Sequence, residues 1–305
     1  MKTLIAVVGA TASGKTALSI ELAKHFGAEV LSADGRQFYE EMCIGTARPT
    51  PQEMGTVPHH FVASRSIHAP LYSVGDFERE ALVCLDKIFR TQDVAVLVGG
   101  SGLYVKALCE GMDDMPNVPL SLREQLTEQF QKQGLEPLLV QLQTLDPVYF
   151  EQVDKANHQR VIRALEMCMA TGQPYSSFRK KAQAERPFRV LKLAIDLPRE
   201  QLYDRINRRV LQMVADGLEA EARALLPFRE LNCLQTVGYS EWFEHWDGLY
   251  SREQAIERIQ QNTRRYAKKQ LTWFGRDEQV RWFSAQALEQ QQHLQWLEQE
   301  LNKKD

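Results

Sequence analysis

The segment GATASGKT, residues 9–16, has the residue types and the spacing of a phosphate-binding loop. Its glycines let successive backbone N–H groups surround a phosphate, and the N-terminus of a following helix adds positive potential. The Lys15 ammonium can reach the outer phosphate, and the Thr16 hydroxyl can ligate Mg²⁺. We therefore expect eight residues to hold a diphosphate: Gly9, Ala10, Thr11, Ala12, Ser13, Gly14, Lys15 and Thr16. The loop alone does not tell which bond of the phosphorylated ligand breaks.

An acidic residue, Asp34, ends the second apolar run of the chain, AEVLSAD at 28–34. Nucleotide hydrolases usually place an Mg²⁺-binding Asp at the end of a hydrophobic strand, but the run VAVLV at 94–98 continues into glycines instead. A carboxylate after the strand that follows the phosphate loop can act as a general base near the phosphates. On this segment alone, an Asp that only caps the turn before Gly35 is the alternative.

The alternation of apolar runs and helical segments predicts an α/β fold with a parallel, P-loop NTPase-like sheet. Continuous apolar runs are typical of strands buried on both faces. The expected strands are 3–8, 28–34 and 94–98, and the expected helices are 15–26, 76–92 and 103–110. Ligands of such sheets bind at the carboxyl ends of the strands. The phosphate loop, Asp34 and the turn that contains Ser101 are therefore expected to face one crevice.

The pattern changes after residue 110. The segment GMDDMPNVPLS at 111–121 is rich in proline, and Ser121 can cap a helix that starts at Leu122. Helical patterns continue to about residue 179, and a strand-like run at 188–196 could then rejoin the sheet. Helical stretches follow to the C-terminus. We therefore expect a discontinuous core domain of 1–114 and 187–305, interrupted by a mostly helical insertion domain of 115–186.

The charge of the chain is unevenly distributed. The net charge of −3 does not by itself indicate a nucleic-acid-binding protein. Residues 155–192 nevertheless contain nine Lys or Arg against Glu166 and Glu185, and residues 262–276 add five cations with no carboxylate. Because local charge decides which polyanion can dock, these stretches are either RNA-binding surfaces or solvated helix faces.

The cysteines and the apolar runs indicate the cellular compartment. The five cysteines form no Cys-x-x-Cys pair, which argues against a zinc site or a disulfide framework and suits a reducing environment. The apolar run before the phosphate loop is too short to span a membrane. We therefore expect a cytoplasmic protein that does not bind a membrane. We also expect a monomer that has no obligate protein partner.

The segment SADGRQFYEEMCIGTARP at 32–49, together with GATASGKT and LVGGSGLYVKAL at 97–108, closely resembles the bacterial tRNA dimethylallyltransferases. Further matches are HQRVIRALE (158–166), DGLEAEARAL (216–225), TVGYSE (236–241) and TRRYAKKQLTWF (263–274). The resemblance implies transfer of the dimethylallyl group of dimethylallyl diphosphate to N6 of an adenosine. That adenosine follows the anticodon on its 3′ side in tRNAs that read codons starting with U. The diphosphate would be the leaving group, so a carbon–oxygen bond breaks.

The resemblance also implies catalytic roles for four residues. Asp34 matches the general base that accepts the proton of N6. Ser101 stands where the family has a threonine whose hydroxyl contacts the substrates. Lys15, Mg²⁺ bound to Thr16, and Arg223 would stabilise the negative charge of the departing diphosphate.

The implied macromolecular partner is the anticodon stem-loop of tRNA, whose base must leave its stack to react. The residues matched to tRNA contacts are Asp34, Gly35, Arg36, Gln37, Ser101, Arg123, Gln159, Arg160, Val161, Ile162, Arg163, Arg264 and Lys268. Gln270 is a further tRNA-facing candidate, whereas Tyr266, Trp273 and Phe274 are expected in the core rather than as stacking platforms. Gly35 departs from the family, which usually has Ser there.

Three other functions share part of this pattern. An adenylate prenyltransferase of the cytokinin-forming kind would have the same phosphate loop and Asp34, but less need for a basic insertion. A P-loop kinase of a small metabolite would be expected to have an acid after the run at 94–98. A non-catalytic, nucleotide-gated RNA-binding module would have no use for Asp34 in the crevice.

Overall fold

The computed structural model describes residues 1–113, 115–179 and 184–303, which form two compact units. We call Met1–Glu110 together with Arg186–Asp305 the core unit, and Gly111–Glu185 the insertion unit. No helix in the described ranges is long and apolar enough to cross a membrane.

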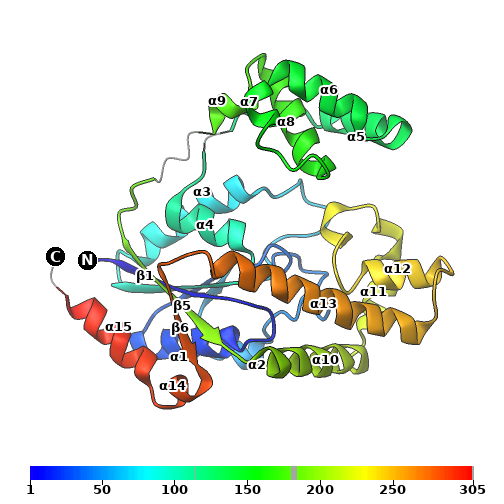
Figure 1. Ribbon diagram of the computed structural model, residues 1–305. Coiled ribbons are helices and arrows are strands. Elements are labelled where there is room, and N and C mark those ends of the chain that lie inside the picture. The colour runs from blue at the N-terminus through cyan, green and yellow to red at the C-terminus, as the bar shows by residue number, and fades with distance from the viewer. Residues whose placement is uncertain (114, 180–183, 304–305) are drawn as a thin grey trace. The chain divides into compact units, whose positions relative to one another are not determined.

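A parallel sheet of six strands forms the centre of the core unit (Figure 1). Its strands, in spatial order, are β3 (His59–His60), β2 (Val30–Ser32), β4 (Val94–Gly99), β1 (Thr3–Val8), β5 (Arg189–Asp196) and β6 (Val280–Ser284). Each neighbouring pair is parallel, and Ile5 of β1 lies opposite Val96 of β4 and Leu191 of β5. The carboxyl ends of β1, β4 and β2 therefore lie side by side at one edge of the sheet.

Helices cover both faces of this sheet (Figure 1). One face carries α1 (Lys15–Phe26), α14 (Ala285–Glu289) and α15 (Gln292–Asn302), and the other carries α3 (Val74–Ile88), α4 (Gly102–Glu110) and α13 (Arg252–Phe274). Other helices are α2 (Pro51–Met54), α10 (Arg199–Ala215), α11 (Leu218–Leu225) and α12 (Ser240–Trp246). Successive side chains of β1 alternate between the two layers, so that Ile5 packs with α1 whereas Leu4 packs on the opposite side.

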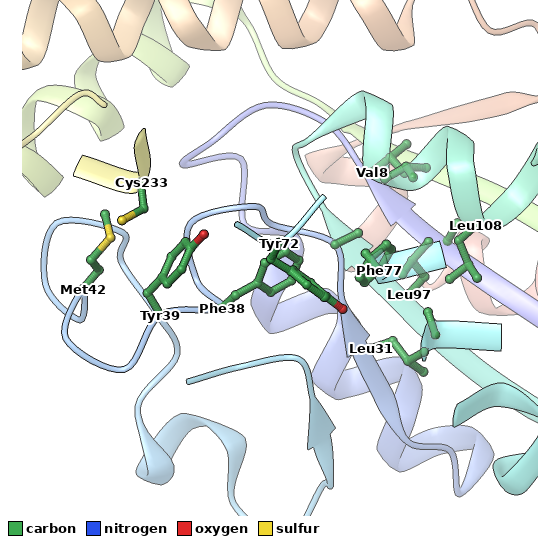
Figure 2. Close-up of a cluster of buried hydrophobic side chains, with 14 of the residues drawn as sticks. Val8, Leu31, Phe38, Tyr39, Met42, Tyr72, Phe77, Leu97, Leu108 and Cys233 are labelled. Atoms are coloured by element: carbon green, nitrogen blue, oxygen red, sulfur yellow. The ribbon is translucent and has the colours of Figure 1, made fainter. Parts of the chain in front are cut away.

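The hydrophobic cluster on the face of the sheet covered by α3, α4 and α13 contains aromatic residues that hold the chain following β2 in place (Figure 2). Phe38 is buried, and its ring stacks on Phe77 of α3 with 5.6 Å between centroids. It also meets the ring of Tyr104 of α4 at 5.5 Å. Because Phe38 lies four residues after Asp34, this packing fixes the turn that carries the predicted general base.

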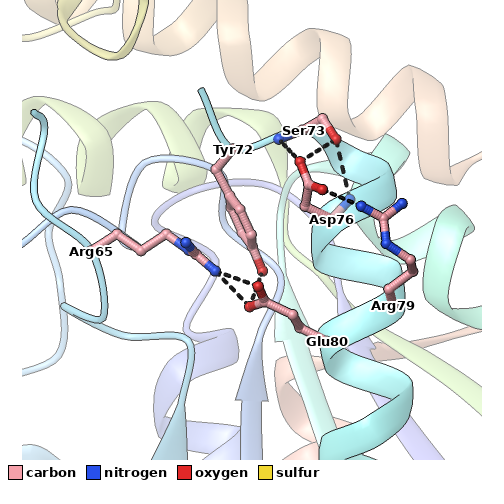
Figure 3. A network of polar contacts seen from close by, with 6 residues as sticks. All are labelled: Arg65, Tyr72, Ser73, Asp76, Arg79 and Glu80. Carbon is pink, nitrogen blue, oxygen red and sulfur yellow. Dashed lines mark hydrogen bonds and ion pairs between the residues drawn. The ribbon is translucent and has the colours of Figure 1, made fainter. Parts of the chain in front are cut away.

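A polar network fastens the next part of the chain to the start of α3 (Figure 3). Ser73 and Asp76 form a capping box, in which each side chain accepts a hydrogen bond from the other residue's backbone N–H. Glu80, one turn later, accepts hydrogen bonds from Arg65 at 2.6 Å and from the Tyr72 hydroxyl at 3.0 Å. The Arg65 guanidinium also lies 3.7 Å from the centroid of the Tyr72 ring. These contacts support the strand-like segment beside Phe38, because the backbone N–H of Arg65 donates to the Phe38 carbonyl at 3.0 Å.

The insertion unit is entirely helical within its described residues. Its helices are α5 (Leu120–Gln133), α6 (Glu136–Leu145), α7 (Pro147–Phe150), α8 (His158–Thr171) and α9 (Tyr175–Phe178). They enclose a separate apolar core that includes Leu126, Leu138 and Leu165. Buried Asp146 accepts hydrogen bonds from the backbone N–H groups of Tyr149 and Ser176, which ties α9 to the start of α7.

The predicted α/β fold is confirmed, and the run at 188–196 rejoins the sheet as β5 beside β1. Two short strands were not predicted: β3 has two residues, and β6 interrupts a stretch predicted as helical throughout. The helix expected to start at Leu122 starts at Leu120, with Pro119 rather than Ser121 at the N-cap.

The two units separate at Gly111 and Glu185, where the sequence suggested 115 and 186. Asp114, the last residue of the expected first core segment, lies outside the described residues, as do Lys180 and Lys181 of the basic stretch.

Candidate active site

The glycine loop joins β1 to α1 and has a backbone that requires glycine at two positions. Gly9 has φ 131° and Gly14 has φ 103°, values at which another residue would be strained. Gly14 caps α1 without a side-chain hydrogen bond, and the first N–H groups of a helix have no partner within the helix. An anion at this end of α1 would gain these donors and the helix dipole.

Lys15 is partly buried at the end of this loop, and its Nζ donates to the carbonyl of Ala10 at 3.0 Å. Burial lowers the pKa of its ammonium to about 8, Arg209 lowers it further, and the nearby Asp34 carboxylate opposes the shift. The ammonium is therefore held in a desolvated place where an anionic ligand would restore its usual pKa.

The phosphate loop forms one wall of a cavity of about 560 Å³ within the core unit. The opposite wall comes from α10, which contributes Arg205 and Arg209. Arg205 donates to the Ser13 carbonyl at 3.2 Å, and Arg209 donates to Oγ1 of Thr11 at 3.3 Å. Thr16 also lines this cavity. We call it the first cavity.

Neither of these two arginines forms an ion pair within the part of the chain that the structure describes, although the carboxylates of Asp34 and Glu53 act on Arg209 from a distance. A carboxylate on the same helix, Asp204, pairs with Arg208 instead. Burial lowers the pKa of Arg209, and Asp34 opposes that shift. The first cavity therefore gathers cations whose natural counter-charge is a ligand such as a diphosphate. Arg205 and Arg209 were not among the predicted site residues.

A second cavity of about 390 Å³ adjoins the first. Asp34, Arg209 and Met213 line both cavities, so Asp34 stands at their junction. The residues that line the second cavity include Gly35, Arg36, Ser101 and Tyr266, together with the apolar Ile206, Val210, Met213, Leu218, Val237 and Ile259. Both cavities lie within the core unit.

The groups around Asp34 are arranged by short local contacts. Its Oδ1 accepts a hydrogen bond from the backbone N–H of Arg36 at 3.1 Å, and Oγ of Ser101 accepts one from the N–H of Gly35 at 3.2 Å. Burial at the hydroxyl raises the pKa of Tyr266 to about 12, and a hydrogen bond with Ser101 opposes this. A Cβ added at Gly35 would lie 3.0 Å from the Tyr104 ring, a tight contact that the ring would have to relieve by shifting a few tenths of an ångström.

Gln270 of α13 joins the loops that follow β1 and β4. Its Oε1 accepts from the N–H of Thr11 at 2.8 Å, and its Nε2 donates to the carbonyl of Gly100 at 2.9 Å. The side chain is only 5% exposed, so the sequence-based expectation that Gln270 faces tRNA is wrong. Its role is to hold the phosphate loop against the turn that carries Ser101.

The expectation that three aromatic residues of α13 lie in the core is right for one of them. Phe274 is buried, whereas Tyr266 is 40% exposed and Trp273 is 46% exposed. Trp273 packs over Gly102, where an added Cβ would come within 2.2 Å of the indole nitrogen. Tyr266 lines the second cavity, so sequence reasoning missed a residue of the site.

Arg223 does not reach the site. It lies on the exposed side of α11, where its guanidinium stacks 3.8 Å from the ring centroid of Trp246. It lines neither cavity, because Leu218 and Ala222 on the other side of the helix face the core. The structure therefore corrects the prediction for Arg223, which lies outside the site. Arg209 lines both cavities instead.

Four of the predicted tRNA-contacting residues of α8 differ in their surroundings. Val161 and Ile162 are 0% and 6% exposed in the core of the insertion unit, so their side chains cannot contact a ligand and the prediction for them is wrong. Arg160, by contrast, is exposed, as is the neighbouring Gln159.

Arg123 and Arg163 both form ion pairs with Glu166, which is only 1% exposed. Arg123 donates from Nε to Oε2 of Glu166 at 2.8 Å. Each arginine still keeps a large part of its side chain in contact with solvent. On α13, Arg264 donates to Oδ1 of Asn207, and Lys268 is exposed.

A parallel sheet with a glycine loop after a central strand, and cations converging on that loop, defines a P-loop-like α/β fold. The model of the IPP transferase family matches residues 37–277 of the chain. The chain belongs to the IPP transferase family.

Close relatives have similar length. The chain is 48% identical over 283 residues to tRNA dimethylallyltransferase 1 of Bacteroides thetaiotaomicron, covering 93% of this chain and 92% of that protein. It is 50% identical over 282 residues to a tRNA dimethylallyltransferase of Cytophaga hutchinsonii, covering 92% of each.

Solved structures of tRNA-modifying transferases also match the chain. The tRNA isopentenylpyrophosphate transferase of Bacillus halodurans matches with a TM-score of 0.68 at 37% identity, covering 93% of this chain and 90% of that chain. A eukaryotic dimethylallyltransferase, seen in crystallographic snapshots acting on tRNA, matches with a TM-score of 0.78 at 26% identity. The match covers 93% of this chain and 74% of that chain.

Proposed function

We propose that the protein transfers the dimethylallyl group of dimethylallyl diphosphate to N6 of the adenosine that follows the anticodon in tRNAs reading codons that start with U. The observation that carries this proposal is the division of α10 into two rows. Arg205 lines the first cavity only, Ile206 and Val210 line the second only, and Arg209 and Met213 line both at their junction. An allylic diphosphate has the same division, with an anionic head and a short apolar tail. The relatives that are called tRNA dimethylallyltransferases support the same function.

The residues of the core unit then have definite tasks. The phosphate loop and Lys15 bind the diphosphate, and Arg209 and Arg205 contact it from α10. N6 of adenine attacks the allylic carbon, whose bond to the bridging oxygen breaks, and the bonding electron pair leaves with the diphosphate. Asp34, at the junction of the cavities, accepts the N6 proton. The cations stabilise the charge that builds on the leaving group.

An Mg²⁺ ion fits the first cavity. Thr16 lines it at the start of α1 and offers a hard oxygen ligand, as Mg²⁺ prefers. When bound, the ion would neutralise charge on the diphosphate, which would supply other ligands together with water.

The acceptor adenosine enters the second cavity after it leaves its stack in the anticodon loop. Asp34, Ser101 and Tyr266 would contact the base. Gly35, Arg36 and Gln37 follow Asp34 in the chain and would line the entrance. Arg123, Gln159, Arg160 and Arg163 of the insertion unit, and Arg264 and Lys268 of the core unit, would contact the anticodon stem-loop. We further propose that the protein acts as a cytoplasmic monomer with no obligate protein partner.

One assay tests the proposal. The protein is incubated with labelled dimethylallyl diphosphate, Mg²⁺ and either unmodified tRNA, AMP or ATP. We expect label only in tRNA. Label only in AMP would favour the adenylate prenyltransferase, and label in none of the three acceptors would contradict both prenyl-transfer functions.

A further inference from the structure

The carboxylate of Glu221, on α11, joins three segments of the chain to which the reaction above gives no task. They are IGTARP at 44–49, DGLEAEARAL at 216–225 and TVGYSE at 236–241. Its Oε2 accepts hydrogen bonds from the backbone N–H groups of Cys43 at 3.0 Å and Ile44 at 2.8 Å. Its Oε1 accepts from the N–H of Gly45 at 2.9 Å and from the Tyr239 hydroxyl at 2.7 Å. Four donors use the full accepting capacity of one carboxylate.

The loop that Glu221 holds, residues 43–47, has a constrained backbone. Ala47 has φ 48°, a left-handed conformation that is costly for a residue other than glycine. Gly45 lies so close to the Tyr239 ring that an added Cβ would come within 2.5 Å of it. Such a conformation persists only where the surroundings determine it strongly, and the three N–H groups bound by Glu221 do so.

This loop in turn orients two side chains of the site. Nε2 of Gln37 donates to the carbonyls of Thr46 at 3.2 Å and Ala47 at 3.3 Å. Arg209 donates to the same Ala47 carbonyl at 3.4 Å. Thr46 and Ala47 line both cavities. A shift of the loop would therefore move the wall of both cavities and the guanidinium that faces the diphosphate.

We infer that Glu221 is a positioning residue for the transfer reaction: through the loop at 43–47 it fixes Arg209 and Gln37 in the site. This inference rests on the proposed function for its kinetic consequences, but the loop contacts themselves are independent of it. Glu221 touches no substrate, since it lines neither cavity.

The test is the substitution Glu221→Gln, which keeps size and shape but replaces one accepting oxygen with an NH₂ group. If that NH₂ group faces Cys43 and Ile44, both of their hydrogen bonds are lost. If it faces Gly45 and Tyr239, the Gly45 bond is lost and the Tyr239 hydroxyl accepts from the NH₂ group instead. We expect amide hydrogen exchange at Cys43, Ile44 and Gly45 to become about tenfold faster. We also expect the KM for dimethylallyl diphosphate to rise about tenfold, with the affinity for tRNA nearly unchanged.

Glu219→Gln is the matched control. Glu219 lies on the same helix and carries the same charge, but it pairs with Arg252 at 2.7 Å, away from the loop. It should leave both the exchange of residues 43–45 and the KM for the donor at wild-type values. A purely electrostatic effect of removing one negative charge from α11 would instead change KM in both variants and overturn the inference.

Gly45→Ala tests the same inference with Glu221 intact, and serves if Glu221→Gln fails to fold. Its added methyl group must displace the loop from Tyr239, so it should reproduce the raised KM for the donor. Wild-type kinetics in a folded Glu221→Gln or Gly45→Ala protein would overturn the inference. If the wild-type protein transfers no label, the proposed function fails, and the exchange measurement still decides whether Glu221 holds the loop.

Discussion

Two arginines that line the first cavity of the core unit and two arginines of the insertion unit are held in opposite ways. In the core unit, Arg205 and Arg209 line a cavity and bond to backbone carbonyls or a hydroxyl, with no carboxylate partner among the described residues. In the insertion unit, Arg123 and Arg163 share buried Glu166. The first arrangement leaves the counter-charge to be supplied by a ligand, and the second supplies it from the protein.

This contrast separates the two tasks of a tRNA-modifying enzyme. A desolvated cation without a partner interacts strongly with an anion that replaces water, which is what stabilisation of a leaving group requires. A cation that is already paired and half exposed interacts weakly and is screened by salt. We therefore expect losses in the core unit to affect chemistry, and losses in the insertion unit to affect tRNA affinity.

The largest effect is expected for Asp34→Asn, which removes the proton acceptor at the junction of the cavities. Turnover should fall by about 10²–10⁴-fold, while tRNA affinity changes little because the side chain stays isosteric. Single-turnover transfer and a filter-binding measurement check the two halves of this expectation. Turnover near the wild-type rate would show that Asp34 is not the base.

Arg209→Ala should lower kcat/KM for the donor by about 10²–10³-fold, because a charge-stabilising group that faces the diphosphate is lost. Arg209→Lys is the control: it keeps the charge without the bidentate geometry and should recover only part of the loss. Arg223→Ala, by contrast, should leave donor kinetics unchanged. A donor defect of equal size in Arg223→Ala would contradict the geometry of the site.

The pH dependence of donor binding should sharpen the contrast. Burial lowers the pKa of Lys15 to about 8, so the free protein loses this cation as the pH rises through 8. The KM for dimethylallyl diphosphate should then rise, by up to about tenfold per pH unit, whereas tRNA affinity, to which Lys15 does not contribute, should stay constant. In Lys15→Arg the rise should disappear, because Arg does not titrate in this range. A KM that stays flat from pH 7 to 9.5 in the wild type would contradict the assigned pKa.

The smallest effect is expected for Arg160→Ala in the insertion unit. Arg160 is exposed and should contact phosphate, so tRNA should bind about threefold to tenfold more weakly, and the slope of log affinity against log salt should become shallower by about 1. Donor KM should not change. An unchanged salt slope would make Arg160 a structural residue only.

Features with a local signature could be predicted from the sequence. The phosphate loop, its two strained glycines and Asp34 each follow from a few neighbouring residues that obey backbone rules. The strand at 188–196 was visible because apolar residues dominate the run, although Arg189 and Lys192 interrupt it. The strand β6 was not, since five residues between helices carry too little periodicity.

Residues whose role depends on how their helix packs in the tertiary structure could not be placed from the sequence. Arg209 and Arg223 both lie on helices of the matched region, and only packing decides which of the two helices turns its arginine into the cavity. One signal was available: Arg205 and Arg209 are spaced four apart, directly beside the apolar row of Ile206, Val210 and Met213. Gln270 gave no signal, because a polar residue buried between two loops looks like a surface residue in the sequence.

The bond from the Thr11 backbone to Gln270 spans 259 residues of chain, and this spacing has a consequence for synthesis. The ribosome releases the phosphate loop early, but the residues that support it on the other side come from α10 and α13, after the insertion. An emerging chain therefore carries the loop for most of its synthesis without the groups that complete the site. Because contacts so distant in the sequence form late, we expect a truncated chain that ends before α13 to bind the donor more weakly than the full chain.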